Sequence, residues 1–141
     1  MQKIILSVLV MSILVSCKNE QKGSGSFTVS GMLSNAPSKI IYIEETNIAT
    51  GEKKVKNSAD IGAEGKFTMK VDGVNEAAYN LRFSTDPSPF ATIINDASKI
   101  NVEVDFNKRY DFYKVSGSKA SQSIQEFLAK VNEILNQKLN S

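Results

Sequence analysis

The stretch "KFTMKVD", residues 66–72, decides the fold, because polar and apolar residues alternate along it one by one. Successive side chains of an extended strand point to opposite faces, so the three apolar residues share one face. The same alternation is found in "YNLRFS", residues 79–84, and in "INVEVDF", residues 100–106. These three segments predict strands with one dry face and one wet face, as is common in antiparallel sheets.

Weaker alternation continues on both sides of these strands. Turn residues such as Asp72-Gly73 and Asp86-Pro87 punctuate the pattern at short intervals. Eight short strands without helical segments between them indicate a mainly β fold, an antiparallel β-sandwich, and exclude a doubly wound α/β fold. The additional strands are expected at residues 27–33, 39–45, 54–61, 90–95 and 111–116.

After Gly117 the apolar period changes to 3.6, which predicts one amphipathic helix from about Lys119 to Lys138. Ser118 is the expected N-cap, and Ser123 with Glu126 offers an alternative capping box. The apolar stripe of this helix contains Ile124, Phe127, Leu128, Val131, Ile134, Leu135 and Leu139.

The predicted helix is longer than the sandwich can cover. Twenty residues of helix extend ~30 Å, whereas strands of five to seven residues span only ~17 to 24 Å. We expect Ile124, Phe127 and Leu128 to dock against the β domain. The remaining apolar side chains are expected to protrude and to contact a partner protein or a second copy, and they are Val131, Ile134, Leu135 and Leu139.

The N-terminus has the plan of a secretory signal peptide, with Lys3 followed by an apolar block at residues 4–15. As a helix this block would span only ~18 Å, short of the roughly 30 Å hydrocarbon core of a bilayer. The block ends in "LVSC", residues 14–17, which resembles the bacterial lipobox. In a lipobox the cysteine thiol accepts diacylglycerol and becomes the first residue after cleavage.

Cys17 is therefore the expected lipidation site, and the acyl chains are the expected membrane anchor. Residues 1–17 form the predicted signal peptide, and the Gly/Ser-rich residues 18–26 form a flexible tether with a reach of ~15 to 18 Å. Residues 27–117 form the predicted sandwich, and residues 118–141 contain the C-terminal helix. The expected location is the cell envelope, at the periplasmic or the surface face of the outer membrane.

Composition excludes several classes of function. The chain has no histidine and one cysteine, so it lacks the common general base, the common zinc ligand and, once Cys17 is acylated, any free thiol. Loss of Lys3 with the signal peptide reduces the 17 basic residues to 16, against 15 acidic ones. This balance argues against recruitment to nucleic acid. We expect no catalytic residue, no cofactor and no metal, and we expect that the chain is not an enzyme.

Several quoted segments resemble one family, the uncharacterised N-terminal β domain (domain of unknown function 4369) of Bacteroidota thioredoxin-like lipoproteins. The segments are "FTVSGML", "IIYIEE", "SADIGAEGKFTMKVDGV", "INDASKINVEVDF" and "VSGSKASQSIQEF". In relatives the last motif leads on to a thioredoxin domain with a Cys-x-x-Cys pair, which is not found before Ser141 here. The resemblance implies a structural domain without thiol chemistry, either a free-standing accessory domain or a remnant.

Three other polar groupings have simpler structural explanations. Lys108–Lys114 mixes basic and aromatic residues as single-strand binders do, but a turn followed by a strand accounts for it. Glu44 and Glu45 are adjacent, so on a strand they point to opposite faces and cannot pair as acid and base. Oxygen atoms of Asp86, Ser88, Asn95 and Asp96 could gather near loop tips as calcium ligands, but no EF-hand spacing is present and turn chemistry explains these residues more simply.

The sequence thus predicts a membrane-anchored envelope lipoprotein that binds or positions another component without catalysis. One alternative is an accessory subunit of a separately encoded thiol-disulfide oxidoreductase. Another is a surface module that binds glycan or peptide on an open sheet face, which clustered exposed aromatic residues would favour.

Overall fold

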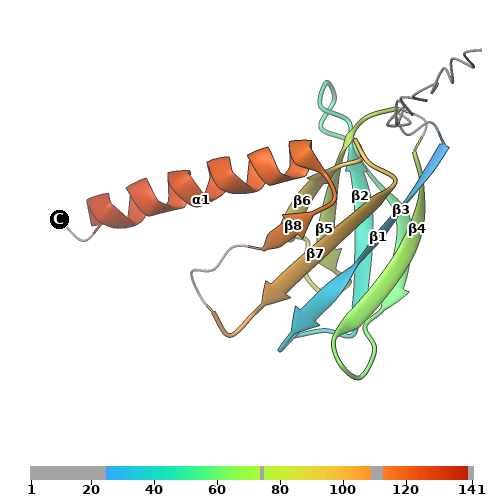
Figure 1. Ribbon diagram of the computed structural model, residues 1–141, viewed down its shortest axis with the longest axis horizontal. Helices are drawn as coiled ribbons and strands as arrows, with labels where there is room; N and C mark the ends of the chain where they lie inside the picture. Colours follow the sequence, from blue (N-terminus) through green and yellow to red (C-terminus); the bar gives the residue numbers. More distant parts are fainter. Residues whose placement is uncertain (1–24, 74, 109–112, 140–141) are drawn as a thin grey trace, which may run out of the picture.

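The computed structural model describes residues 25–73, 75–108 and 113–139, which form two β-sheets and one long helix (Figure 1). The predicted signal peptide, Cys17 and the basic-aromatic residues 109–112 lie outside the described residues. The elements are β1 Gly25–Ser34, β2 Ile40–Thr46, β3 Lys53–Asp60, β4 Lys66–Gly73, β5 Ala78–Phe83, β6 Pro89–Ile94, β7 Lys99–Asp105, β8 Lys114–Ser116 and α1 Lys119–Leu139.

The two sheets have the strand orders β4-β1-β7-β8 and β3-β2-β5-β6, and their apolar faces enclose a single core. The alternation of residues 66–72 is confirmed, since every second side chain of β4 is buried. Fully buried side chains come from both sheets, for example Val29 and Val102 from one and Ile43 and Leu81 from the other. The predicted mainly β fold with one C-terminal helix is confirmed.

One strand pair departs from the expected antiparallel arrangement. β1 and β7 run parallel, with Val29 paired with Ile100 and Gly31 with Val102, whereas the other pairs are antiparallel. The sequence did not reveal this pairing, because a strand with one dry face alternates in the same way in both orientations. β1 also begins within the predicted tether, at Gly25, which pairs with Gly73.

The two sides of the sandwich are closed differently. On one side, β3 is an edge strand that carries Lys53, Lys54 and Lys56, and charges of this kind discourage pairing with other chains. Asn57 of β3 donates a hydrogen bond to the carbonyl of Lys70 on β4 at 2.6 Å. On the other side, the edge strands β6 and β8 meet the start of α1.

The starts of β1 and α1 lie at the same end of the sandwich. The Thr28 amide donates to the Ser98 carbonyl in the β6–β7 turn at 2.9 Å. The backbone of Gly117, just before α1, lies against Lys99, the first residue of β7. A Cβ at Gly117 would stand 2.3 Å from the Lys99 carbonyl oxygen, and φ is +88° there, so glycine is required.

Tyr113 connects the two sheets beside α1. Its ring is buried, and its hydroxyl donates to the Thr92 carbonyl of β6 at 2.8 Å. Burial raises the pKa of the Tyr113 phenol above 10.0, and burial followed by the charge of Glu45 raises the pKa of Tyr79 in the same direction. Ionisation of either phenol would place a charge in the core.

We expect this burial to set the alkaline limit of stability. In the unfolded chain the phenol ionises at a pKa of about 10, whereas in the folded chain its pKa is higher. Its contribution to the free energy of unfolding is therefore fully present below about pH 10 and is lost as the pH rises through the folded-state pKa. Denaturant unfolding between pH 8 and 11 should therefore show a decline that begins above about pH 10. Tyr113→Phe should cost about 1 kcal/mol at pH 8 and flatten the alkaline decline. An unchanged slope would show that Tyr113 is not the titrating group.

Candidate functional site: the exposed face of the C-terminal helix

Two serines at the start of α1 attach the helix to the edge of β6. The Ser118 hydroxyl accepts the Ser121 amide at 2.9 Å, which confirms Ser118 as the N-cap. The Ser121 hydroxyl accepts the Ile94 amide at 2.8 Å, and both hydroxyls lie 3.2 Å from the Ile94 carbonyl oxygen. Both serines are almost completely buried. The alternative capping box is not formed, because the Ser123 hydroxyl donates to the Lys119 carbonyl within the helix.

Two glutamines attach the same turns of α1 to the edge of β8. The Val115 amide donates to Oε1 of Gln125 at 3.0 Å, and Nε2 of Gln122 donates to the Val115 carbonyl at 3.3 Å. Oδ2 of Asp96 accepts the Ala120 amide at 2.9 Å, where a negative charge suits the helix dipole. The motif "VSGSKASQSIQEF" therefore has a structural role: Ser118, Ser121, Gln122 and Gln125 satisfy backbone groups at strand edges that would otherwise be open.

The helix docks along one side and leaves several apolar side chains exposed. Ser121, Ile124, Gln125 and Leu128 follow the spacing i, i+3, i+4, i+7 and form the face that meets the sandwich. Beyond them α1 extends past the sheets (Figure 1). The exposed apolar side chains, here called the apolar face, are Phe127 (67% exposed), Val131 (37%), Ile134 (47%), Leu135 (54%) and Leu139 (83%). Leu135 and Leu139 continue the docked side beyond the sheets, whereas Phe127, Val131 and Ile134 point to one side of it.

The expected exposure of Val131, Ile134, Leu135 and Leu139 is confirmed, but the expected docking of Phe127 is wrong. Ile124 and Leu128 are half-buried as expected, and Leu128 packs against the core. Phe127 lies three positions after Ile124, on the edge of the stripe that turns away from the sheets. Hydrophobic spacing alone therefore underestimated the size of the exposed apolar face.

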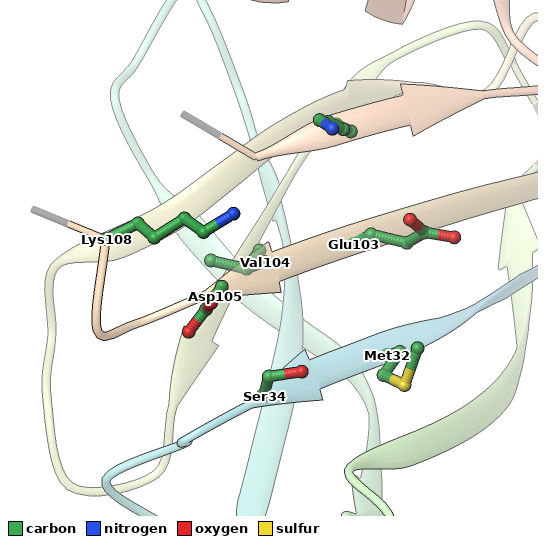
Figure 2. Close-up of a pocket in the computed structure, with 7 residues that line it drawn as sticks. Met32, Ser34, Glu103, Val104, Asp105 and Lys108 are labelled. Atoms are coloured by element: carbon green, nitrogen blue, oxygen red, sulfur yellow. The ribbon is translucent and has the colours of Figure 1, made fainter. Parts of the chain in front are cut away.

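The structure also contains a shallow polar pocket that the sequence did not indicate. It lies on the outer face of β1 and β7 (Figure 2) and is lined by Met32, Ser34, Glu103, Val104, Asp105, Lys108 and Lys114. Its volume is about 160 Å³. A hydrogen bond from the Asn35 side chain and one from the Asn107 amide lower the pKa of Asp105. The lining carries two acidic and two basic side chains, so the pocket favours neither anionic nor cationic ligands. In the sequence, only the polar face of residues 99–105 indicated it.

The remaining polar groupings are accounted for by structure. Glu44 pairs with Arg82 at 2.7 Å and Glu45 with Lys56 at 3.0 Å, so the two carboxylates do not act together. The calcium candidates do not gather: Asp86 caps the Ser88 amide before β6, whereas Asn95 and Asp96 follow β6 at its other end. Among the described residues, no group of three or more histidines, cysteines or carboxylates could hold a metal ion.

Exposed aromatic residues do not cluster on a sheet face in the described part of the chain. Most of the rings belong to the core, including a group formed by Phe83, Phe90 and Phe106 with centroids 4.9 to 5.5 Å apart. Tyr42 lies outside the core, with the Arg82 guanidinium 4.8 Å from its ring centroid. Phe127, on the helix, is the large exposed ring of the described residues.

Two four-stranded sheets and an amphipathic helix with an exposed apolar face define a β-sandwich module. The family model described as domain of unknown function (DUF4369) matches residues 27–123, and the chain belongs to this family. The matched segment contains nearly all of the sandwich and the first turn of α1, and it ends before Phe127. Comparisons with curated proteins and with solved structures found no match. Within the described residues, no helix is long and apolar enough to cross a membrane.

Proposed function

We propose that the chain is a lipid-anchored module of the cell envelope that binds or positions another envelope component and has no catalytic activity of its own. Support for the anchor comes from the sequence, where an apolar block after Lys3 ends in the lipobox-like "LVSC" with Cys17 as the single cysteine. Support for binding comes from the apolar face of α1. The anchor and the apolar face together would hold a bound partner at a fixed distance from the membrane.

The apolar face is the observation that carries the binding role. A soluble domain rarely leaves five large apolar side chains exposed on one helix unless they meet something. The first turns of α1 are fixed because the Ile94 amide donates to the Ser121 hydroxyl and the Val115 amide donates to the Gln125 side chain, so the exposed turns continue from a rigid base. A rigid base lowers the entropy cost of binding.

The position of β1 is compatible with anchoring and binding at the same end. β1 begins at Gly25, close to the end of the sandwich from which α1 starts. Residues 18–24 separate Cys17 from β1 and, at about 5 to 6 Å times the square root of their number, would reach about 15 Å. An anchored chain would therefore hold α1 near the lipid surface.

Replacing Cys17 with serine should remove the anchor. A serine hydroxyl is not the thiol that accepts diacylglycerol, so we expect an unprocessed precursor and no incorporation of labelled palmitate in a bacterial host. Ser16→Ala, which keeps the thiol and a small neighbour, is the matched control and should remain in the membrane fraction. Palmitate labelling of Cys17→Ser equal to that of the control would refute the lipoprotein proposal.

A second candidate is an accessory subunit of a separately encoded thiol-disulfide oxidoreductase. The resemblance to the N-terminal domain of thioredoxin-like lipoproteins favours it, and the apolar face would then receive the partner. The chain alone should show no disulfide reductase turnover above background, because acylation leaves it no free thiol. Turnover that survives repurification would contradict both candidates. The glycan- or peptide-binding alternative is less favoured, because the described aromatic side chains do not cluster on a sheet face.

A further inference from the structure

The β2–β3 hairpin loop, residues 47–52, carries the most exposed large apolar side chain of the described residues. Ile48, at its tip, is 86% exposed, and residues 47–51 contain no charged side chain. Single apolar residues are common on protein surfaces, so exposure alone indicates no function. Two other features distinguish Ile48: the hydrogen bonding of the hairpin loop and the end of the sandwich at which it lies.

The backbone of the hairpin loop is hydrogen-bonded within itself. The Asn47 side chain accepts the amides of Ala49 at 2.9 Å and Thr50 at 3.2 Å. The Gly51 amide donates to the Asn47 carbonyl at 2.7 Å, and the Glu52 amide donates to the Thr50 hydroxyl at 3.3 Å. Four consecutive amides are thus satisfied without water, so the tip can enter an apolar environment without leaving these donors unpaired.

The hairpin loop lies at the end of the sandwich where β1 begins (Figure 1). Glu45, near the end of β2, pairs with Tyr79, and the Tyr79 ring packs against Phe27 of β1 with centroids 4.9 Å apart. Gly25, the first residue of β1, pairs with Gly73, where a Cβ would stand 2.7 Å from the Tyr79 hydroxyl. An N-terminal lipid anchor would therefore reach the domain at the end that carries the hairpin loop.

The charges of the described residues at this end balance, so an apolar contact is favoured over an electrostatic one. Outside the Glu45–Lys56 ion pair, the strand ends and turns here carry basic and acidic side chains in equal number, namely Lys53, Lys54, Lys99 and Lys119 against Glu52, Asp72, Glu76 and Asp96. A surface of this kind is not drawn to a membrane by charge, and its contact with lipid should persist at high salt.

One isoleucine is sufficient to orient a chain that is already anchored. Removal of an exposed isoleucine side chain from water favours the inserted state about tenfold. That factor is too small to hold a free chain on a membrane, where two signals are usually needed. For an anchored chain the second contact is intramolecular, and the same factor decides which end of the domain faces the lipid.

We propose that Ile48 inserts into the lipid surface to which the chain is anchored, so that the hairpin loop is a second membrane contact and sets the orientation of the sandwich. This inference rests on the proposed lipid anchor and assigns a lipid-binding role to a part of the domain itself. Because α1 begins at the same end, its first turn would be held close to the lipid.

The contact is tested with the lipidated full chain in phosphatidylcholine vesicles, with a nitrobenzoxadiazole probe on an introduced cysteine. Ala49→Cys places the probe beside Ile48, and Ala63→Cys places it in the exposed turn at the far end of β3, ~26 Å along the strand. A nitroxide on the lipid acyl chains should quench the probe at residue 49 roughly threefold more than the probe at residue 63. The difference should be the same at about 0.1 M and about 1 M salt.

The outcomes separate this inference from the anchor. Equal quenching of the two probes, in chains that stay with the vesicles, would overturn insertion of the hairpin loop and leave the proposed anchor standing. Chains that the vesicles do not retain would contradict the anchor and the inference together.

Two substitutions at the tip test whether the isoleucine or the probe enters the lipid. In the Ala49→Cys chain, Ile48→Asp should lower the quenching to the level at residue 63, and Ile48→Leu should keep it. Both variants should melt at the temperature of the parent, since the side chain of Ile48 is 86% exposed. If Ile48→Asp is quenched as strongly as Ile48→Leu, the probe enters the lipid by itself and the inference is wrong.

Discussion

Gly31→Ala should abolish or severely reduce the stability of the sandwich. Gly31 of β1 pairs with Val102 of β7, and a Cβ built on Gly31 would stand 1.7 Å from the Val102 carbonyl oxygen. Because the obstacle is backbone, it cannot turn aside as a side chain would, and the two central strands must separate. We expect a loss of about 4 kcal/mol or more in the free energy of unfolding, in the range reserved for severe core defects.

Gly62→Ala is the matched control for this prediction. A Cβ at Gly62 would meet the Lys66 carbonyl oxygen at 3.4 Å, which is ordinary contact, so the change should stay within about 0.5 kcal/mol. Denaturant unfolding of the two purified variants, followed by circular dichroism, gives the comparison. Equal stability of both variants would show that the parallel β1–β7 pairing is wrong.

Arg82→Met should be the second most damaging of these substitutions. Nε of Arg82 donates to Oε1 of Glu44 at 2.7 Å, and its Nη1 donates to the Phe83 carbonyl at 3.0 Å. Glu44 is only 6% exposed, so the substitution leaves a buried carboxylate without its cation. Removal of one partner of a buried pair costs about 3 kcal/mol, and we expect a loss of that size in the free energy of unfolding.

Two further variants identify the cause. The double variant with Arg82→Met and Glu44→Leu should recover most of the loss, because it removes the stranded charge as well. Lys56→Met breaks the more exposed ion pair with Glu45 and should cost less than about 1 kcal/mol. If the double variant is no more stable than Arg82→Met, packing of the arginine against Tyr42 carries the effect instead.

The strands were predictable where burial differs sharply between the two faces. Polar and apolar side chains alternate completely along residues 66–72, so the local sequence was sufficient to predict a strand there. The apolar period of 3.6 residues was likewise sufficient to predict α1. The parallel pairing of β1 with β7 was not predictable, because it depends on contacts between segments about 70 residues apart in the chain. Gly31 gave no local signal either, since its role depends on how closely Val102 approaches.

The candidate site was predictable only in part. The excess length of the helix over the strands indicated that Val131, Ile134 and Leu135 would protrude, and they do. Phe127 was assigned wrongly, because the docking direction is set by Ser121 and Gln125. The spacing of apolar residues gives no information about polar residues that bind strand edges.

The proposal that Cys17 anchors the module is tested most directly by mass spectrometry of the N-terminal peptide of the chain recovered from membranes. The account predicts a peptide that begins at Cys17 and carries the mass of diacylglycerol and a further acyl chain. A peptide that begins at Met1, or one in which Cys17 is unmodified, would contradict it.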